Sequence, residues 1–107
     1  MALEFREFTI SFDPTKGQKQ RERTRIALNG DLVQRNKVQA VLKGFHMGYT
    51  DDDREIKELE IDLDIEEINT SNNSVTVAAD FLIRDASGKI DDRFDGFVQG
   101  VVIAEVR

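Results

Sequence analysis

Apolar and polar residues alternate along most of this chain with a period of two, the spacing of a β-strand that buries one face. In the clearest stretch, four aliphatic residues alternate with four acidic ones: Leu59, Ile61, Leu63 and Ile65 with Glu60, Asp62, Asp64 and Glu66. A helix would spread these carboxylates around its axis. A strand places the aliphatic side chains in the core and the acids in water.

The same alternation predicts strands over residues 8–12, 23–28, 37–49, 75–83 and 97–106. Turn signals separate them. Asp13-Pro14 is expected to end the first strand, because proline lacks the N–H that a ladder needs. Asn29-Gly30-Asp31 and residues 69–73 are predicted turns, and residues 85–96 a long polar loop.

One predicted strand changes phase in its middle. Its apolar residues are Val38, Ala40 and Leu42 before Gly44, and Phe45, Met47 and Tyr49 after it. A one-residue shift at a glycine is typical of a β-bulge.

No stretch has a helical period. The sequence therefore predicts an all-β fold, an antiparallel β-sandwich of about six to seven strands forming a single domain over residues 1–107. No segment approaches the roughly 18 apolar residues of a membrane span. The start, MALEFREFTI, lacks the pattern of a signal peptide, so we expect a soluble protein made in the cytoplasm, with its final compartment left open.

The chain has 21 acidic and 15 basic residues, a net charge of −6, and no cysteine. The first 45 residues carry nine basic and five acidic side chains (+4), and residues 46–107 carry six and sixteen (−10). Disulfides and cysteine-based zinc sites are excluded. The acidic part would repel phosphates, so we expect no nucleic-acid partner.

Two predicted strands, residues 37–49 and 97–106, have large apolar residues on both faces over part of their length. The residues concerned are Phe45 and Met47 in the first strand and Val101 and Ile103 in the second. A central strand covered by a loop, or a bulge, explains this pattern. A contact between copies of the chain explains it as well, since exposed apolar surface on a small acidic domain marks association. We expect a homo-oligomer with these four residues at its interface.

Enzymatic activity is not expected. His46 is the single histidine, so a histidine-based triad or metal site lacks partners, and a structural or surface role is predicted for it. The acidic row at residues 58–66 is predicted to be solvated and paired with basic side chains, Lys37 and Lys43 among them. The basic stretch KGQKQRERTR is expected to guard a sheet edge.

Two acidic segments are candidates for binding. The first is residues 51–53. The second contains Asp85, Asp91, Asp92 and Asp95, which as oxygen ligands form an alternative Ca²⁺ site, although the spacing does not match an EF-hand. Plain solvated loops explain both segments without a metal and are the favoured interpretation, so we expect no metal or other cofactor.

The run VQAVLKGFHMGYTDDDREIKELEIDLDIEEINTSNNSVTVAADFLIRD, followed by GFVQGVVIAEV, resembles the H-type lectin domain over the last two-thirds of the chain. Val38–Leu42, Ile68-Asn69-Thr70, Val75–Ala79 and Val101–Ala104 match that pattern by residue type. The resemblance implies a six-stranded sandwich, assembly as a trimer and shallow sites for N-acetylgalactosamine or related sugars. The aromatic–histidine pair of that family is absent before the last strand, so no family binding residue is carried over.

The sequence thus predicts a non-enzymatic, oligomeric carbohydrate-binding domain. Carboxylates would bind sugar hydroxyls and an aromatic ring would stack on the sugar. The predicted ligand-binding residues are Asp51, Asp52, Asp53, Asp91, Asp92, Phe94, Asp95 and Tyr49. The alternative is a structural or assembly subunit of a larger complex that binds no small molecule.

Overall fold

The computed structural model describes residues 2–15, 19–33, 37–49, 56–85 and 94–107, and these residues form six strands and no helix. Hence none of them belongs to a helix that could cross a membrane. The strands are β1 (Ala2–Thr15), β2 (Gln20–Ala27), β3 (Val38–Tyr49), β4 (Ile56–Asn69), β5 (Ser74–Asp85) and β6 (Phe94–Val106).

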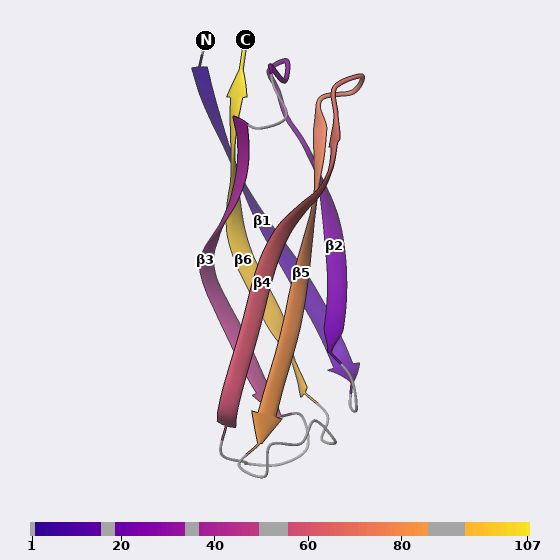
Figure 1. Ribbon diagram of the computed structural model, residues 1–107, viewed down its shortest axis with the longest axis vertical. Coiled ribbons are helices and arrows are strands. Elements are labelled where there is room, and N and C mark those ends of the chain that lie inside the picture. Colours follow the sequence, from indigo (N-terminus) through magenta and orange to yellow (C-terminus); the bar gives the residue numbers. More distant parts are fainter. Residues whose placement is uncertain (1, 16–18, 34–36, 50–55, 86–93) are drawn as a thin grey trace.

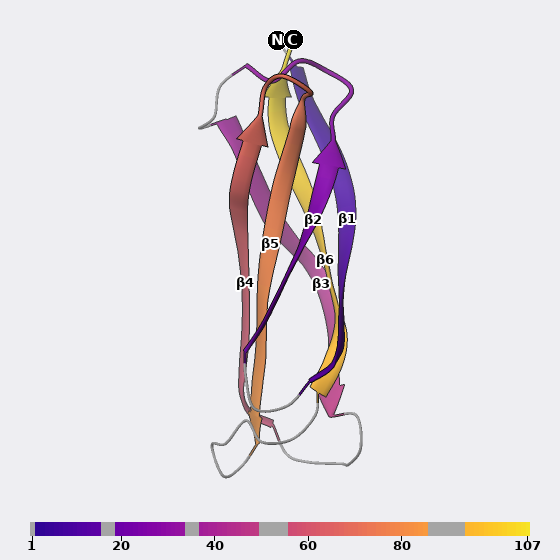
Figure 2. The same ribbon diagram turned by 90° about the vertical axis from the view of Figure 1, so that its right-hand side faces the viewer.

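The strands form two antiparallel three-stranded sheets, ordered β1-β6-β3 and β2-β5-β4. The sheets face each other along a body of 50 × 20 × 18 Å, with both termini at one end (Figures 1 and 2). The predicted all-β antiparallel sandwich is confirmed. Because each sheet has three strands, β6 and β5 are central, while β1, β3, β2 and β4 are edges.

The core lies between the two sheets and is richest on the central strands. Val98, Val102 and Ala104 of β6 and Val77 and Phe81 of β5 have no exposed surface. Aromatic rings fill the end of the core away from the termini: Phe81 stacks on Phe12 at 4.3 Å between centroids, and packs on Phe94 at 5.8 Å. The period-two alternation therefore identified the buried faces of the central strands correctly.

Several predicted strand ends are wrong. The first strand, predicted over residues 8–12, begins already at Ala2, and β4 includes Asn69, which was predicted to belong to a turn. β1 continues through Pro14 to Thr15, because it is an edge strand and its pairing with β6 shifts register between Phe12 and Thr15, where a missing N–H is tolerated. β2 begins at Gln20, whose buried amide donates a hydrogen bond to the Phe94 carbonyl oxygen at 3.1 Å. β6 begins at Phe94, inside the segment predicted as a loop, because that ring belongs to the core.

The predicted bulge at Gly44 is confirmed. Leu42 pairs with Gly100 and Gly44 with Gln99, so Lys43 is the extra residue on β3. Before and after the bulge, the apolar row of β3 stays on the inner side of the sheet.

The aliphatic row of β4 is less buried than predicted. Leu59 remains 41% exposed, and Ile61, Leu63 and Ile65 are only partly buried. The reason is that β4 is an edge strand. Only the inner strands of a sandwich are covered across their full width.

The outer face of the β2-β5-β4 sheet is an ionic lattice. Arg21 of β2 reaches across β5 and bonds Asp80 at 2.8 Å, Glu66 at 3.2 Å and Asp64 at 3.4 Å. Arg23 pairs with Glu66 at 3.0 Å, and Lys19 with Glu60 at 3.1 Å. Hydrogen bonds to Asp80 and then to Glu66 raise the pKa of Arg21, so it stays charged.

The acidic side chains of β4 are paired with basic side chains, as predicted. Their partners are Arg21, Arg23 and Lys19, whereas Lys37 and Lys43 were predicted. Lys43 instead lies on the other sheet, where it pairs with Glu7 at 2.8 Å. β2 carries the basic stretch at a sheet edge, as expected. The long side chains also cover β5, because Ala78 and Leu82 of the outer row are at most 2% exposed.

At the end that holds the termini, the Glu4 carboxylate fastens the turn after β2 to β1. It accepts hydrogen bonds from the backbone N–H groups of Asn29, at 2.8 Å, and Gly30, at 2.9 Å, and from Arg6 at 2.7 Å. Burial alone raises the pKa of Glu4. The two backbone hydrogen bonds and Arg6 outweigh burial, so the net pKa lies below its ordinary value.

Replacing Glu4 by glutamine is expected to lower the free energy of unfolding at pH 7 by about 1–2 kcal/mol, because charge-assisted hydrogen bonds are lost. A depressed carboxyl pKa stabilises the fold above the unfolded value of about 4.3, and that contribution disappears as pH falls through the folded value. Urea unfolding at pH 7 and pH 3 tests this: the gap between wild type and variant should close in acid. An equal gap at both pH values would contradict it.

Candidate functional site

Most of the loop carboxylates predicted to bind a ligand lie outside the described residues. These are Asp51, Asp52, Asp53, Asp91 and Asp92, and the side chain of Asp85 also lies outside them. Chain order places these segments between β3 and β4 and between β5 and β6. Of the alternative Ca²⁺ set, only the Asp95 side chain is described. Among the described side chains, no three acidic or histidine residues group as a metal site would require.

The three remaining candidates lie on different sides of the sandwich. Phe94 is fully buried against Phe81, so its predicted role of stacking on a sugar is wrong: no face of the ring reaches the surface. Tyr49 pairs with Phe94 on the inner side and packs partly buried against the core. Asp95 points to the outer face of the β1-β6-β3 sheet, opposite Gly48.

The four predicted interface residues belong to two surfaces. Phe45 and Met47 lie on the inner row of β3, at the flank shared with β4, where Phe45 is 47% exposed. Val101 and Ile103 lie on the outer face of the β1-β6-β3 sheet and are partly exposed. The bulge at Lys43 and the alternation of β6 separate the pairs, so they do not form one patch.

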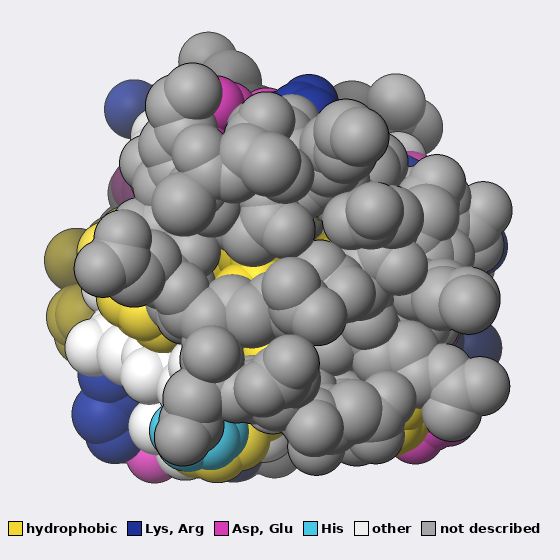
Figure 3. Space-filling model, turned by 90° about the horizontal axis from the view of Figure 1, so that it is seen from below, with side chains coloured by type: hydrophobic (Ala, Val, Ile, Leu, Met, Phe, Trp, Pro, Cys, Tyr) yellow, Lys and Arg dark blue, Asp and Glu magenta, His cyan; other side chains and the backbone are white. Residues whose placement is uncertain are grey.

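The outer face of the β1-β6-β3 sheet falls into two halves. Toward the termini it carries most of its exposed apolar side chains, and we call this the apolar half: Leu3, Phe5, Val41, Val101 and Ile103, with Glu7, Gln39 and Glu105 as polar cross-strand neighbours on the same face. Toward the opposite end it becomes polar, and this polar half consists of Thr9, Ser11, Gly44, His46, Gly48, Asp95, Phe97 and Gln99. Figure 3 looks at the opposite end, where apolar and polar side chains of the described residues reach the surface side by side.

A pair of rings forms the centre of the polar half. His46 of β3 and Phe97 of β6 are directly opposite in the ladder, and their rings stack at 5.7 Å with an angle of 27°. His46 is exposed and Phe97 is partly exposed, so the parts of the two rings that do not face each other are at least partly open to solvent. We call His46 and Phe97 the ring platform.

Glycines leave open space on both sides of the platform. Among the described residues, a Cβ atom at Gly48 would meet nothing within 4 Å, and one at Gly44 would meet only the Gln99 side-chain oxygen, at 3.8 Å. Both glycines share the strand face of His46, two positions away on either side. A flat ligand can therefore lie on the rings without meeting neighbouring side chains of β3.

Polar groups surround the platform on the other two strands. Asp95 and Gln99 of β6 flank Phe97 on the same face, and Ser11 of β1 is its direct cross-strand neighbour. The carboxylate and amide oxygens accept hydrogen bonds, while the hydroxyl and the amide nitrogen donate them. The arrangement combines one apolar ring surface with several hydrogen-bonding groups.

The sequence patterns did not predict this site: they indicated a structural or surface role for His46 and no binding role for Phe97. The spacing Gly44-x-His46-x-Gly48 is a usable signal, since it predicts one exposed ring between two gaps on a strand face. The pairing of His46 with Phe97 joins residues 51 positions apart, and no local pattern predicts it.

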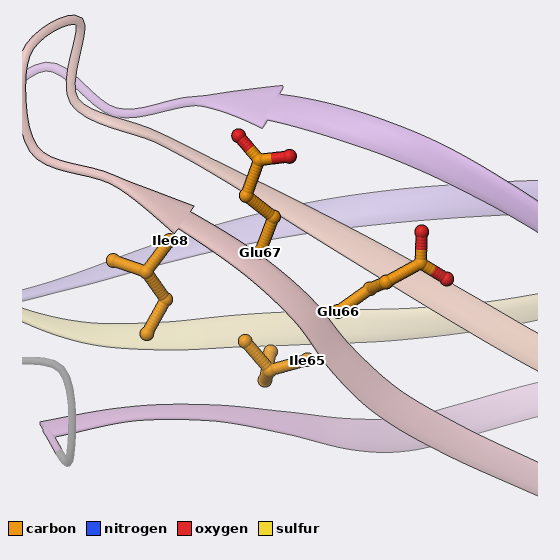
Figure 4. Close-up of a pocket in the computed structure, with 4 residues that line it drawn as sticks. All are labelled: Ile65, Glu66, Glu67 and Ile68. Atoms are coloured by element: carbon orange, nitrogen blue, oxygen red, sulfur yellow. The ribbon is translucent and has the colours of Figure 1, made fainter.

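A shallow hollow also lies on β4. It is lined by four consecutive residues at the second bulge of that strand, Ile65, Glu66, Glu67 and Ile68. In Figure 4 the glutamates point to one side of the strand and the isoleucines to the other. Glu66 is already bound by Arg21 and Arg23. The hollow therefore offers no converging set of free polar groups.

The fold and the ring platform together define an all-β sandwich domain with an open, ring-bearing sheet face. No protein-family model matches the chain, and no curated protein and no solved structure shows significant similarity to it.

Proposed function

We propose that the protein is a non-enzymatic carbohydrate-binding domain that works as a homo-oligomer, and that the ring platform is its sugar site. The observation that carries this proposal is the stacked, solvent-facing pair of His46 and Phe97 between two glycine gaps. One face of a pyranose ring is a sheet of C–H groups, which pack on an aromatic ring. Its hydroxyls need hydrogen-bonding groups at the rim.

The polar neighbours supply such groups. The carboxylate of Asp95 can accept hydrogen bonds from two adjacent sugar hydroxyls, and Gln99 and Ser11 can donate and accept at the opposite side. Asp95 is the one predicted ligand-binding carboxylate that is described, and it flanks the platform. The loop residues Asp51, Asp52, Asp53, Asp91 and Asp92 remain predicted ligand-binding residues.

A binding role is favoured over catalysis because the described carboxylates lack the environment of a catalytic acid. Those of β4 lie on a solvated lattice and are engaged by Arg21, Arg23 and Lys19. A general acid needs a raised pKa, which burial in an apolar pocket produces.

A single open site of this kind binds sugar weakly, because it covers only one face of the ligand. Several copies joined in one particle compensate, since linked sites raise the overall affinity by about 10²–10⁴-fold. The resemblance to H-type lectins implies a trimer.

Replacing Phe97 by alanine is expected to weaken sugar binding at least tenfold, about 1.4 kcal/mol, because the stacking surface is lost. A glycan array identifies the sugar, and an NMR titration with that sugar measures affinity for wild type, Phe97→Ala and His46→Ala. Phe45→Ala is the matched control, since Phe45 is 47% exposed on a different surface and should leave affinity unchanged.

Two results would contradict the proposal. Sugar binding that survives Phe97→Ala and His46→Ala would move the site away from the platform, toward the loop carboxylates. A silent array with a folded oligomer would favour the second candidate, a structural or assembly subunit without a small-molecule ligand. The observation that favours this candidate is the apolar half of the outer face, which an assembly contact would cover.

A further inference from the structure

We infer that the apolar half of the outer β1-β6-β3 face is the contact between copies of this chain. The inference rests on the proposed homo-oligomer and specifies its surface. Phe5 and Leu3 of β1 are each 61% exposed, and Val41 of β3 is 47% exposed. Phe5 is the direct neighbour of Ile103, and Val41 of Val101, so the side chains form one continuous patch across three strands.

The opposite sheet shows how this protein treats an outer face that stays in water. There, long charged side chains of β2 and β4 cross the central strand and bury Ala78 and Leu82 beneath an ionic lattice. On the β1-β6-β3 sheet, the Lys43–Glu7 ion pair crosses β6 at the Val101 row, while Leu3 and Phe5, nearer the termini, stay 61% exposed. Exposing large aliphatic and aromatic side chains costs free energy, and contiguous patches of this kind mark association surfaces.

The charges at the border of the patch favour a second copy as the occupant. Lys43 and Glu7 form an ion pair at 2.8 Å across the sheet, so the border carries one charge of each sign. A border of this kind is complementary to itself: Lys43 of one copy can face Glu7 of the next.

The size of the apolar half sets the strength of the contact. A long side of the body measures about 50 × 20 Å, so half of it offers roughly 500 Å² for each partner, or about 1,000 Å² in total, the lower limit for a specific interface. A contact centred on the apolar half is therefore expected to be weak and leaves the platform end of the same face open. Copies would then carry their ring platforms beside the contact, which suits multivalent binding.

A charged substitution at Phe5 tests the inference. Wild type should be an oligomer by light scattering coupled to size exclusion at micromolar concentration. Phe5→Glu should lower the particle mass at least twofold while the circular dichroism spectrum stays unchanged. Phe45→Glu is the matched control: it places the same charge at a similarly exposed phenylalanine on the β3–β4 flank, and should keep the wild-type mass. If Phe5→Glu fails to fold, Leu3→Glu replaces it, since Leu3 is equally exposed.

Each failure has its own signature. A monodisperse wild-type monomer, or dissociation by Phe45→Glu but not by Phe5→Glu or Leu3→Glu, overturns the inference. Sugar binding is read separately: a monomer that still binds sugar refutes the contact alone, while an intact oligomer that binds no glycan refutes the sugar site alone. If both proposals hold, monomeric Phe5→Glu keeps the affinity of a single site but loses about 10²-fold or more in avidity on a glycan surface.

Discussion

Replacing Phe81 by alanine is expected to destabilise the protein by about 3–5 kcal/mol, the largest effect of any single core truncation we predict. Phe81 has no exposed surface, stacks on Phe12 at 4.3 Å and packs on Phe94 at 5.8 Å. Its removal leaves a cavity between the sheets and breaks two ring contacts at once. Domains of this size have about 5–15 kcal/mol of stability in total, so the variant should be marginal.

Urea unfolding followed by circular dichroism measures this effect as a lower midpoint at unchanged slope. Phe45→Ala provides the control, because Phe45 is 47% exposed and its truncation should cost clearly less than that of Phe81. Equal losses for the two variants would mean that Phe81 is not at the centre of the core.

Gly96→Ala is expected to cost about 2–5 kcal/mol for a different reason, the approach of two backbones. Gly96 has a φ of +151°, which residues with a side chain rarely adopt. A Cβ atom there would overlap the carbonyl oxygen of His46 on the neighbouring strand. The alanine therefore forces β3 and β6 apart beside the ring platform.

The matched control is Gly48→Ala on the same sheet, where an added Cβ meets none of the described residues within 4 Å and the loss should stay below about 1 kcal/mol. Amide hydrogen exchange should show faster exchange around Gly96 in the first variant only. Unchanged midpoint and exchange in Gly96→Ala would show that the two strands do not approach as closely as described.

Gly96 also links stability to the proposed site. It lies one residue before Phe97, and its close contact is with the carbonyl group of His46, so the same approach of strands that excludes a side chain holds the two rings opposite each other. A variant that separates the strands should lose the platform before it loses the rest of the fold. Sugar affinity in Gly96→Ala is then expected to fall further than in Gly48→Ala.

The order of apolar and polar residues was enough to predict six extended segments, their antiparallel arrangement as a sandwich, most of the turn at residues 69–73 and the bulge at Gly44. These features depend on neighbours within a few positions, because a strand alternates every second residue and a glycine permits a local shift. The buried apolar side chains of the central strands β5 and β6 were predicted correctly for the same reason.

Contacts between residues distant in the chain decided the strand ends, the exposure of the edge strands and the partners of the charged side chains. Edge position left Leu59 exposed and let Pro14 stay inside β1, the core drew Phe94 into β6, and Arg21 rather than Lys37 became the partner of the acidic row. The ring platform joins residues 51 positions apart, and the apolar half of the outer face combines β1, β3 and β6. Strand order and register arise from contacts distant in the chain, and no local alternation specifies which outer face will be charged and which will be bare.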